Sequence, residues 1–171
     1  NPKSIPGQIR VAVVGPGSFV RAIHLPHLKQ MPNQYGIAAI VGRTGSTAWN
    51  IARQYGAKYA TTDLEEACKD PDIDLLMIAN RHDLHAPQAI RAAQAGKAVF
   101  LEKPAAMNSK ELDELIETVR RTGVPFLVGF NRRFSPFMRN VKSLLNQRSN
   151  PLVISYRMNA GSLPADSWIQ G

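Results

Sequence analysis

Short runs of apolar residues alternate along the chain with longer segments in which apolar positions recur every three or four residues. The runs are apolar on both faces and occupy residues 9–15, 35–42, 74–80, 98–102 and 125–130. Runs of this kind are typical of parallel strands buried on both sides of a sheet. We therefore expect a strand at each of these positions.

The segments between the runs have the periodicity and the end signals of helices. Expected helices occupy residues 46–56, 64–69, 84–96, 109–123 and 136–146. Gly56, Gly96 and Gly123 are expected at three C-terminal ends, and Ser109 is the expected N-cap of the fourth helix. Strands that alternate with helices form βαβ units, so the pattern predicts the α/β class.

A polar, turn-rich segment near residues 146–151 marks a domain boundary. We expect a first domain over residues 8–147 and the beginning of a truncated second, α+β domain over residues 148–171. The segment 151–161 resembles a strand, yet no later strand follows that could pair with it. Together with a start at Asn1 rather than Met, this predicts a piece cut from a longer chain.

Composition narrows the class of protein. The 171 residues are 44% hydrophobic and 20% charged, which is typical of a packed globular domain rather than a disordered chain. No apolar run approaches the ~20 residues of a membrane-spanning helix, and no signal peptide is apparent. The single cysteine, Cys68, cannot form an internal disulfide and is expected to be a buried thiol. We expect a cytoplasmic protein without membrane contact.

The formal net charge is +8, and it is concentrated toward the C-terminus. No acid occurs between residues 129 and 165, but six basic residues do: Arg132, Arg133, Arg139, Lys142, Arg148 and Arg157. Such a stretch either binds a phosphate-bearing ligand or faces acidic residues elsewhere in a longer protein. No nucleic-acid-binding motif accompanies it, so we expect no nucleic-acid partner.

A glycine pair follows the first apolar run. Gly15 permits a tight turn, and Gly17 lets the backbone approach a pyrophosphate at the start of the next helix. We expect the adjoining Ser18 and Phe19 at the same phosphates. Val20 stands where the G-x-G-x-x-G/A fingerprint has its third small residue, which predicts looser packing of the helix on the strand.

The end of the second apolar run bears on the choice of cofactor. An acid at this place would bind the ribose hydroxyls of NAD. Here Arg43 occupies it, followed by Thr44 and Ser46. A cation with hydroxyl groups suits a 2′-phosphate, so NADP is favoured over NAD. The alternative is that Arg43 stacks on adenine or faces solvent.

Three stretches, residues 15–28, 78–104 and 128–136, resemble the N-terminal domain of the Gfo/Idh/MocA oxidoreductases. The ending, residues 129–169, further resembles members fused behind a zinc-alcohol-dehydrogenase-like domain. The resemblance implies a Rossmann-type doubly wound parallel sheet and an NAD(P) cofactor. It also implies a sugar, cyclitol or related polyol as substrate and a homo-oligomeric full-length protein.

The resemblance assigns a role to the E-K-P triplet. Lys103 would project toward the nicotinamide and the reacting carbon, where its ammonium can hydrogen-bond the substrate hydroxyl and stabilise alkoxide charge. Glu102 would help to hold Lys103 and the cofactor ribose. Pro104 would fix the turn, with the Lys103–Pro104 bond left open between cis and trans. The alternative is a surface salt bridge at the end of a strand.

Further cofactor contacts are carried over from the same family pattern. Three residues would line the nicotinamide-ribose side of the cleft: Asn80, Arg81 and His82. His85 would orient that loop or cap the next helix. Asn131 and Arg132 would lie near the cofactor or substrate.

The family's general acid/base is a histidine of the second domain with an aspartate partner, and neither is expected within this chain. We therefore expect cofactor binding with little or no turnover, and we assign His24 and His27 to the flanks of the first helix. A non-catalytic regulatory or sensor module is the alternative function. His82, Asp83 and His85 are close in sequence, but their spacing lacks a matched pair and a thiolate, so no metal is expected.

Overall fold

The structure is a computed structural model that describes residues 7–146, 148–157, 159, 161 and 162. The chain divides into two compact units, Asn1–Asn131 and Arg132–Gly171. The first unit contains the sheet and nearly all of the helices. Each unit is considered by itself, and the second domain expected from residue 148 onward stays a prediction.

The first unit is built on one parallel sheet of six strands. Its strands follow the order β3-β2-β1-β4-β5-β6. Their bounds are β1 Ile9–Val14, β2 Tyr35–Val41, β3 Tyr59–Thr61, β4 Leu75–Ile78, β5 Ala98–Leu101 and β6 Phe126–Val128. All five expected strands are confirmed. The three-residue β3 was not predicted, because a half-buried edge strand this short has no apolar run.

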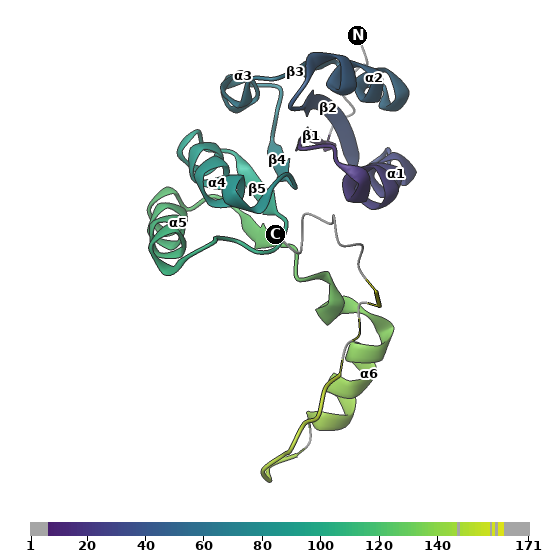
Figure 1. Cartoon of the computed structure of the whole chain (residues 1–171), viewed down its shortest axis with the longest axis vertical. Helices are drawn as coiled ribbons and strands as arrows, with labels where there is room; N and C mark the ends of the chain where they lie inside the picture. The colour runs from purple at the N-terminus through teal and green to yellow at the C-terminus, as the bar shows by residue number, and fades with distance from the viewer. Residues whose placement is uncertain (1–6, 147, 158, 160, 163–171) are drawn as a thin grey trace. The chain divides into compact units, whose positions relative to one another are not determined.

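Helices connect consecutive strands and cover both faces of the sheet (Figure 1). In the first unit they are α1 Leu25–Gln30, α2 Gly45–Tyr55, α3 Leu64–Lys69, α4 His85–Gln94 and α5 Ser109–Thr122. A π-helical turn, Val20–His24, leads into α1, and a 3-10 turn, His82–Leu84, leads into α4. The expected helices are therefore confirmed, and the architecture is the predicted doubly wound α/β sheet.

The core has two parts because successive residues of each strand point to opposite faces of the sheet. Val11 and Val13 of β1 pack with the buried faces of α1 and α2. Ala12 and Val14, from the same strand, pack with residues of α3, α4 and α5. This packing explains why the strand sequences are apolar on both faces.

Helix ends follow the predicted signals with one correction. Gly56, Gly96 and Gly123 adopt left-handed φ values of 71°, 75° and 66°, as expected of glycines at helix C-termini. The N-cap of α5 is Asn108, not Ser109, which is the first helical residue. Asn108 is extended and its side chain accepts the Glu111 N–H, which places the cap one residue earlier.

The second unit contains helix α6, Pro136–Leu145, whose Ser135 N-cap accepts the Met138 N–H. A 3-10 turn, Asn131–Phe134, precedes the helix at the boundary of the units. Residues 151–157, expected to form a strand, are not in one, because no partner strand lies beside them within the described part of this unit. Residues 158 and 160 of the same segment lie outside the described residues. Every helix described is too short or too polar to cross a bilayer.

Candidate functional site

The predicted site residues of the first unit follow the carboxyl ends of its strands. All strands are parallel, so the loops after β1, β2, β4, β5 and β6 leave from one edge of the sheet. The strand order reverses at β1, which pairs with β2 on one side and with β4 on the other. A crevice at such a reversal is where open α/β sheets bind ligands.

Gly15 and Asn80 meet at this reversal. Val14 pairs with Ile78, so the residues that follow the two strands lie side by side. Gly15 has a φ of 78°, and a Cβ atom on it would lie 2.3 Å from Asn80 Cβ. Only glycine fits here, for reasons of both backbone conformation and space.

Gly17 differs from Gly15 because its surroundings are open. A Cβ on Gly17 would have the Gly15 carbonyl oxygen, at 4.0 Å, as its one neighbour. Gly17, Ser18 and Phe19 are exposed, so the loop backbone is accessible. Val20 is 1% exposed and belongs to the core cluster that β1 shares with α1 and α2, and the expected looser packing of the helix on the strand stays a prediction.

Asn80 carries an unsatisfied polar atom. Its Nδ2 donates to Gln88 Oε1 at 2.6 Å. Its Oδ1 is buried and has no hydrogen-bond partner among the residues described. Buried polar atoms are nearly always paired, so an orphan at the crevice suits a bound group that donates a hydrogen bond.

Arg43 and Thr44 follow β2, on the opposite side of β1 from Asn80. Thr44 is the extended N-cap residue of α2, and its Oγ1 hydroxyl bonds to Thr47 Oγ1 at 3.0 Å. Arg43 is exposed, and no carboxylate of the described chain lies within ion-pair distance of it. Its charge is therefore available to an anion.

Glu102 is the most buried carboxylate of the first unit, and its partner is a histidine. The residue is 7% exposed, and its Oε1 lies 2.8 Å from His24 Nε2. Its Oε2 accepts the Lys103 backbone N–H at 3.2 Å. The His24 ring packs edge-on against Phe19 and Phe100, with centroids at 5.2 and 5.5 Å.

Lys103 is exposed, and its ammonium makes no ion pair with a described residue. The surface salt bridge considered from sequence is thus not formed in the described structure, because the Glu102 carboxylate is engaged by His24. The Lys103–Pro104 bond is cis. The loop presents the amine to solvent at the carboxyl end of β5.

His85 joins the loops after β4 and β5. It is 1% exposed, and its Nδ1 lies 2.7 Å from the Pro104 carbonyl oxygen. Its Nε2 lies 3.2 Å from the carbonyl oxygen of Asn80. Both partners are carbonyl oxygens, which can only accept, so a ring nitrogen of His85 is the donor in each hydrogen bond. His85 therefore orients the loop, as expected, and does not cap α4, whose N-cap is Leu84.

His82 lies beside His85 with the ring centroids 5.5 Å apart. Burial lowers the pKa of His82, and the neighbouring His85 and the Lys103 charge lower it further. The imidazole is thus biased toward its neutral form next to the Lys103 amine. This proximity brings together two groups that sequence reasoning had placed on separate loops.

The remaining residues expected at the site make fewer contacts with other described residues. Arg81 pairs with Asp83 at 3.4 Å, and both side chains are exposed. Asn131 is exposed at the end of the first unit, where its N–H donates to the Gly129 carbonyl oxygen. Arg132 begins the second unit, so its relation to the crevice stays a prediction.

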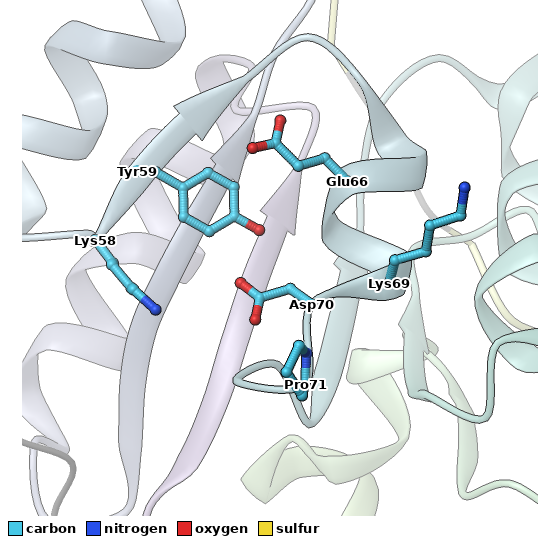
Figure 2. Close-up of a pocket in the computed structure, with 6 residues that line it drawn as sticks. All are labelled: Lys58, Tyr59, Glu66, Lys69, Asp70 and Pro71. Carbon is cyan, nitrogen blue, oxygen red and sulfur yellow. The ribbon is translucent and has the colours of Figure 1, made fainter.

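A shallow cavity of about 480 Å³ lies away from these residues, beside β3 and the end of α3 (Figure 2). It is lined by Lys58, Tyr59, Glu66, Lys69, Asp70 and Pro71. Lys58 is paired with Asp72 at 2.8 Å, and burial raises the pKa of Tyr59. No three His, Cys, Asp or Glu side chains in the described ranges are grouped to hold a metal ion.

His24 is the site residue that sequence reasoning missed, since it was assigned to the flank of a helix. The position of His24 relative to nearby apolar residues indicates that it lies on the buried face of the helix. Val20, His24 and Leu28 recur at intervals of four, and the two apolar members are buried against the sheet. A histidine on the apolar face of a helix needs a polar partner inside, and here that partner is Glu102.

Comparison with known proteins identifies relatives with the same fold. Residues 9–130 match the model of the Gfo/Idh/MocA oxidoreductase family, NAD-binding Rossmann fold. The chain is 35% identical over 128 residues to the 4-carboxy-2-hydroxymuconate-6-semialdehyde dehydrogenase of a Sphingobium species, covering 75% of this chain and 40% of that protein. It is 31% identical over 136 residues to the myo-inositol 2-dehydrogenase of Thermotoga maritima, covering 80% and 39%.

A solved structure shows the same arrangement. The 3-ketoreductase KijD10 of Actinomadura kijaniata, crystallised with NADP and TDP-benzene, matches with a TM-score of 0.75 and 26% identity. The match covers 82% of this chain and 42% of that one. The chain spans about 40% of the length of the curated relatives it matches.

Proposed function

Because the chain belongs to the Gfo/Idh/MocA oxidoreductase family, with an NAD-binding Rossmann fold, we propose that it is the cofactor-binding part of an NAD(P)-dependent dehydrogenase or reductase. The substrate class we propose is a sugar, cyclitol or related polyol. The myo-inositol 2-dehydrogenase supports this class by its name, whereas the names of the semialdehyde dehydrogenase and of the 3-ketoreductase KijD10 show that relatives also act on carbonyl compounds.

One observation carries the proposal: the juxtaposition of Gly15 and Asn80 at the reversal of strand order. Asn80 Oδ1, on the residue that lies against Gly15, has no hydrogen-bond partner among the described residues, and the space around the exposed Gly17 is open to a pyrophosphate. The residues present thus fit a dinucleotide. The loop of Gly17, Ser18 and Phe19 would hold the pyrophosphate. Asn80, Arg81, His82 and Glu102 would hold the nicotinamide half, with His85 fixing their loops and Asn131 and Arg132 at its margin.

The chemistry assigned to this chain centres on Lys103. When bound, the nicotinamide supplies or accepts the hydride. The exposed Lys103 ammonium would hydrogen-bond the substrate oxygen and stabilise the negative charge that develops on it. The neutral-biased imidazole of His82 stands near enough to be coupled to that amine, so it can share in moving a proton.

We further propose that the cofactor is NADP rather than NAD. Arg43 provides an unpaired cation after β2, and the Thr44 hydroxyl lies beside it. A 2′-phosphate would bind the guanidinium through charge-assisted hydrogen bonds, whereas a ribose diol would leave it unsatisfied. The presence of NADP in the KijD10 structure is consistent with this preference.

The test is a titration of the chain with NADPH and NADH, followed by reduced-nicotinamide fluorescence, for the wild type and for Arg43→Ala. We expect tighter binding of NADPH, and we expect Arg43→Ala to weaken NADPH binding about tenfold or more, since charge-assisted hydrogen bonds contribute ~1.5–3 kcal/mol. NADH binding should change little. Arg53→Ala, which removes an exposed arginine from α2, is the matched control and should leave both affinities unchanged.

The outcomes separate two claims. Equal affinities for NADH and NADPH that do not respond to Arg43→Ala would keep the dinucleotide site and refute the NADP preference. If the wild-type chain bound neither cofactor at millimolar concentration, the cofactor-binding role itself would be contradicted for this chain.

A further inference from the structure

We infer that His24 is a positioning residue: through the carboxylate of Glu102 it holds the end of β5 in the shape that receives the nicotinamide half of the dinucleotide. The inference rests on the proposed function. It concerns a side chain that lies in the first helical segment, far in sequence from the E-K-P triplet, and that reaches the triplet only through the fold.

Burial makes this contact necessary. The side chains of His24 and Glu102 are 16% and 9% exposed. A carboxylate this buried is destabilised unless it is paired or hydrogen-bonded. Oε2 has the Lys103 N–H at 3.2 Å, a long bond, whereas Oε1 has His24 Nε2 at 2.8 Å. The imidazole is therefore the stronger of the two partners.

The surrounding groups limit where the carboxylate can go. A Cβ on Gly129, which follows β6, would lie 3.2 Å from Glu102 Oε1 and 3.1 Å from Phe100 Cζ. The carboxylate thus fills the space that the absent side chain leaves. His24 Nε2 bonds to the same oxygen, and the His24 ring packs edge-on against both Phe19 and Phe100.

The arrangement links two parts of the crevice. Phe19 belongs to the open glycine loop after β1, and Glu102 precedes Lys103 at the end of β5. His24 touches both, so it couples the loop proposed for the pyrophosphate to the turn proposed for the nicotinamide. The Glu102 carboxylate is paired with His24, and the Lys103 ammonium makes no ion pair with any residue that the structure describes.

The position along the sheet says which half of the cofactor should depend on His24. Arg43 lies after β2, on the adenosine side of the reversal, and Gly17 lies at the reversal itself. β5 lies beyond β4 on the other side. A ligand that lacks the nicotinamide and its ribose should therefore be insensitive to the His24–Glu102 contact.

The experiment compares NADPH with 2′-phosphoadenosine 5′-diphosphate, which lacks the nicotinamide and its ribose, by calorimetric titration of the wild type, His24→Phe and His24→Gln. Phenylalanine retains a ring between Phe19 and Phe100 but has no donor for Glu102. Glutamine retains an N–H donor. Thermal unfolding of each variant is recorded alongside the titrations.

We expect His24→Phe to weaken NADPH binding about tenfold, the size expected for loss of one hydrogen bond to a charged group, and to leave the affinity for 2′-phosphoadenosine 5′-diphosphate within about twofold. His24→Gln should restore most of the NADPH affinity. A merely structural histidine would not distinguish the two ligands.

Three results would count against the inference. Equal loss of both ligands in His24→Phe, or no loss of either, would overturn it while the wild-type affinity upholds the proposed function. A His24→Phe chain that fails to fold while His24→Gln binds both ligands normally would reduce the contact to a folding role and overturn it too. Failure of the wild type to bind either ligand would instead overturn the proposed function, and this inference with it.

Discussion

Gly15 and Gly17 belong to one loop but are glycines for different reasons. Gly15 is required by the fold, since it combines a φ of 78° with a backbone approach to Asn80 that excludes any side chain. Gly17 has open space around it, so packing within the described structure does not require glycine there. We therefore attribute the glycine at this position to a ligand that approaches the loop from outside. A pyrophosphate is the ligand that this loop geometry favours.

The pair predicts opposite outcomes for two small substitutions. Gly15→Ala should lower the free energy of unfolding by at least about 2 kcal/mol, because it adds backbone strain of ~1–3 kcal/mol and a steric clash with Asn80. Gly17→Ala should leave stability within about 0.5 kcal/mol and weaken NADPH binding about tenfold or more. Urea unfolding and fluorescence titration measure the two effects. Equal stability of the two variants would show that the Gly15 geometry is misjudged.

The residues that sequence reasoning placed correctly are those with local causes. The positive φ of Gly56 and Gly123 follows from their places after helices, and Gly15 follows a strand. Contacts between distant residues could not be read in this way. The bond from His24 to Glu102 spans 78 positions and depends on how β1 and β5 are ordered in the sheet.

At the scale of single elements, α5 shows how its start is specified. Asn108 accepts the Glu111 N–H at 3.0 Å, and its own Nδ2 donates to Glu111 Oε1 at 2.8 Å. Glu111 Oε2 also accepts the Met107 N–H. This reciprocal arrangement satisfies the free N–H groups at the beginning of the helix.

The N-cap assignment can be tested with neighbouring residues. Asn108→Ala should lower the free energy of unfolding by about 1 kcal/mol, because it removes the cap and its bond to Glu111. Ser109→Ala, the matched control, replaces an exposed residue in the first turn and should have an effect of a few tenths of a kcal/mol at most. Chemical denaturation decides between them, and a larger effect at Ser109 would return the cap to that residue.

The strands of the sheet differ in how clearly the apolar pattern of the sequence predicts them. β1, β2 and β4 are buried on both faces toward their carboxyl ends, and β5 alternates half-buried with buried apolar residues, so all four are continuous apolar runs. β3 lies at the edge with all three residues half-buried, and its sequence does not stand out. The segment 151–157, in contrast, has the apolar pattern of a strand but no partner strand in the described part of its unit.

At the scale of the whole molecule, the chain contains one complete sheet and a second unit with an exposed helix. Phe137 and Leu144 of α6 are 70% and 76% exposed, and no residue of that helix is buried. The six basic residues noted between 129 and 165 all belong to this second unit. Whether they serve a phosphate-bearing ligand or acidic residues of a longer chain stays a prediction.

The arrangement of the sheet brings the candidate site residues together. Order and direction of the strands bring the loops of Gly17, Asn80 and Lys103 to one edge, although they lie far apart in sequence. The pattern of strands and helices predicted βαβ units with parallel strands, and the family resemblance implied the doubly wound sheet. The pattern could not predict the contacts within the crevice, because side-chain partners such as those of Glu102 and Asn80 depend on register and local packing.

The central claim is that a dinucleotide binds at this edge, and hydrogen–deuterium exchange of the chain with and without saturating NADPH tests it most directly. We expect NADPH to slow exchange in residues 15–21, 42–45, 79–83 and 102–104. Exchange in residues 58–71, around the shallow cavity, should be unchanged. Protection confined to residues 58–71, or unchanged exchange in all four loops at saturation, would contradict it.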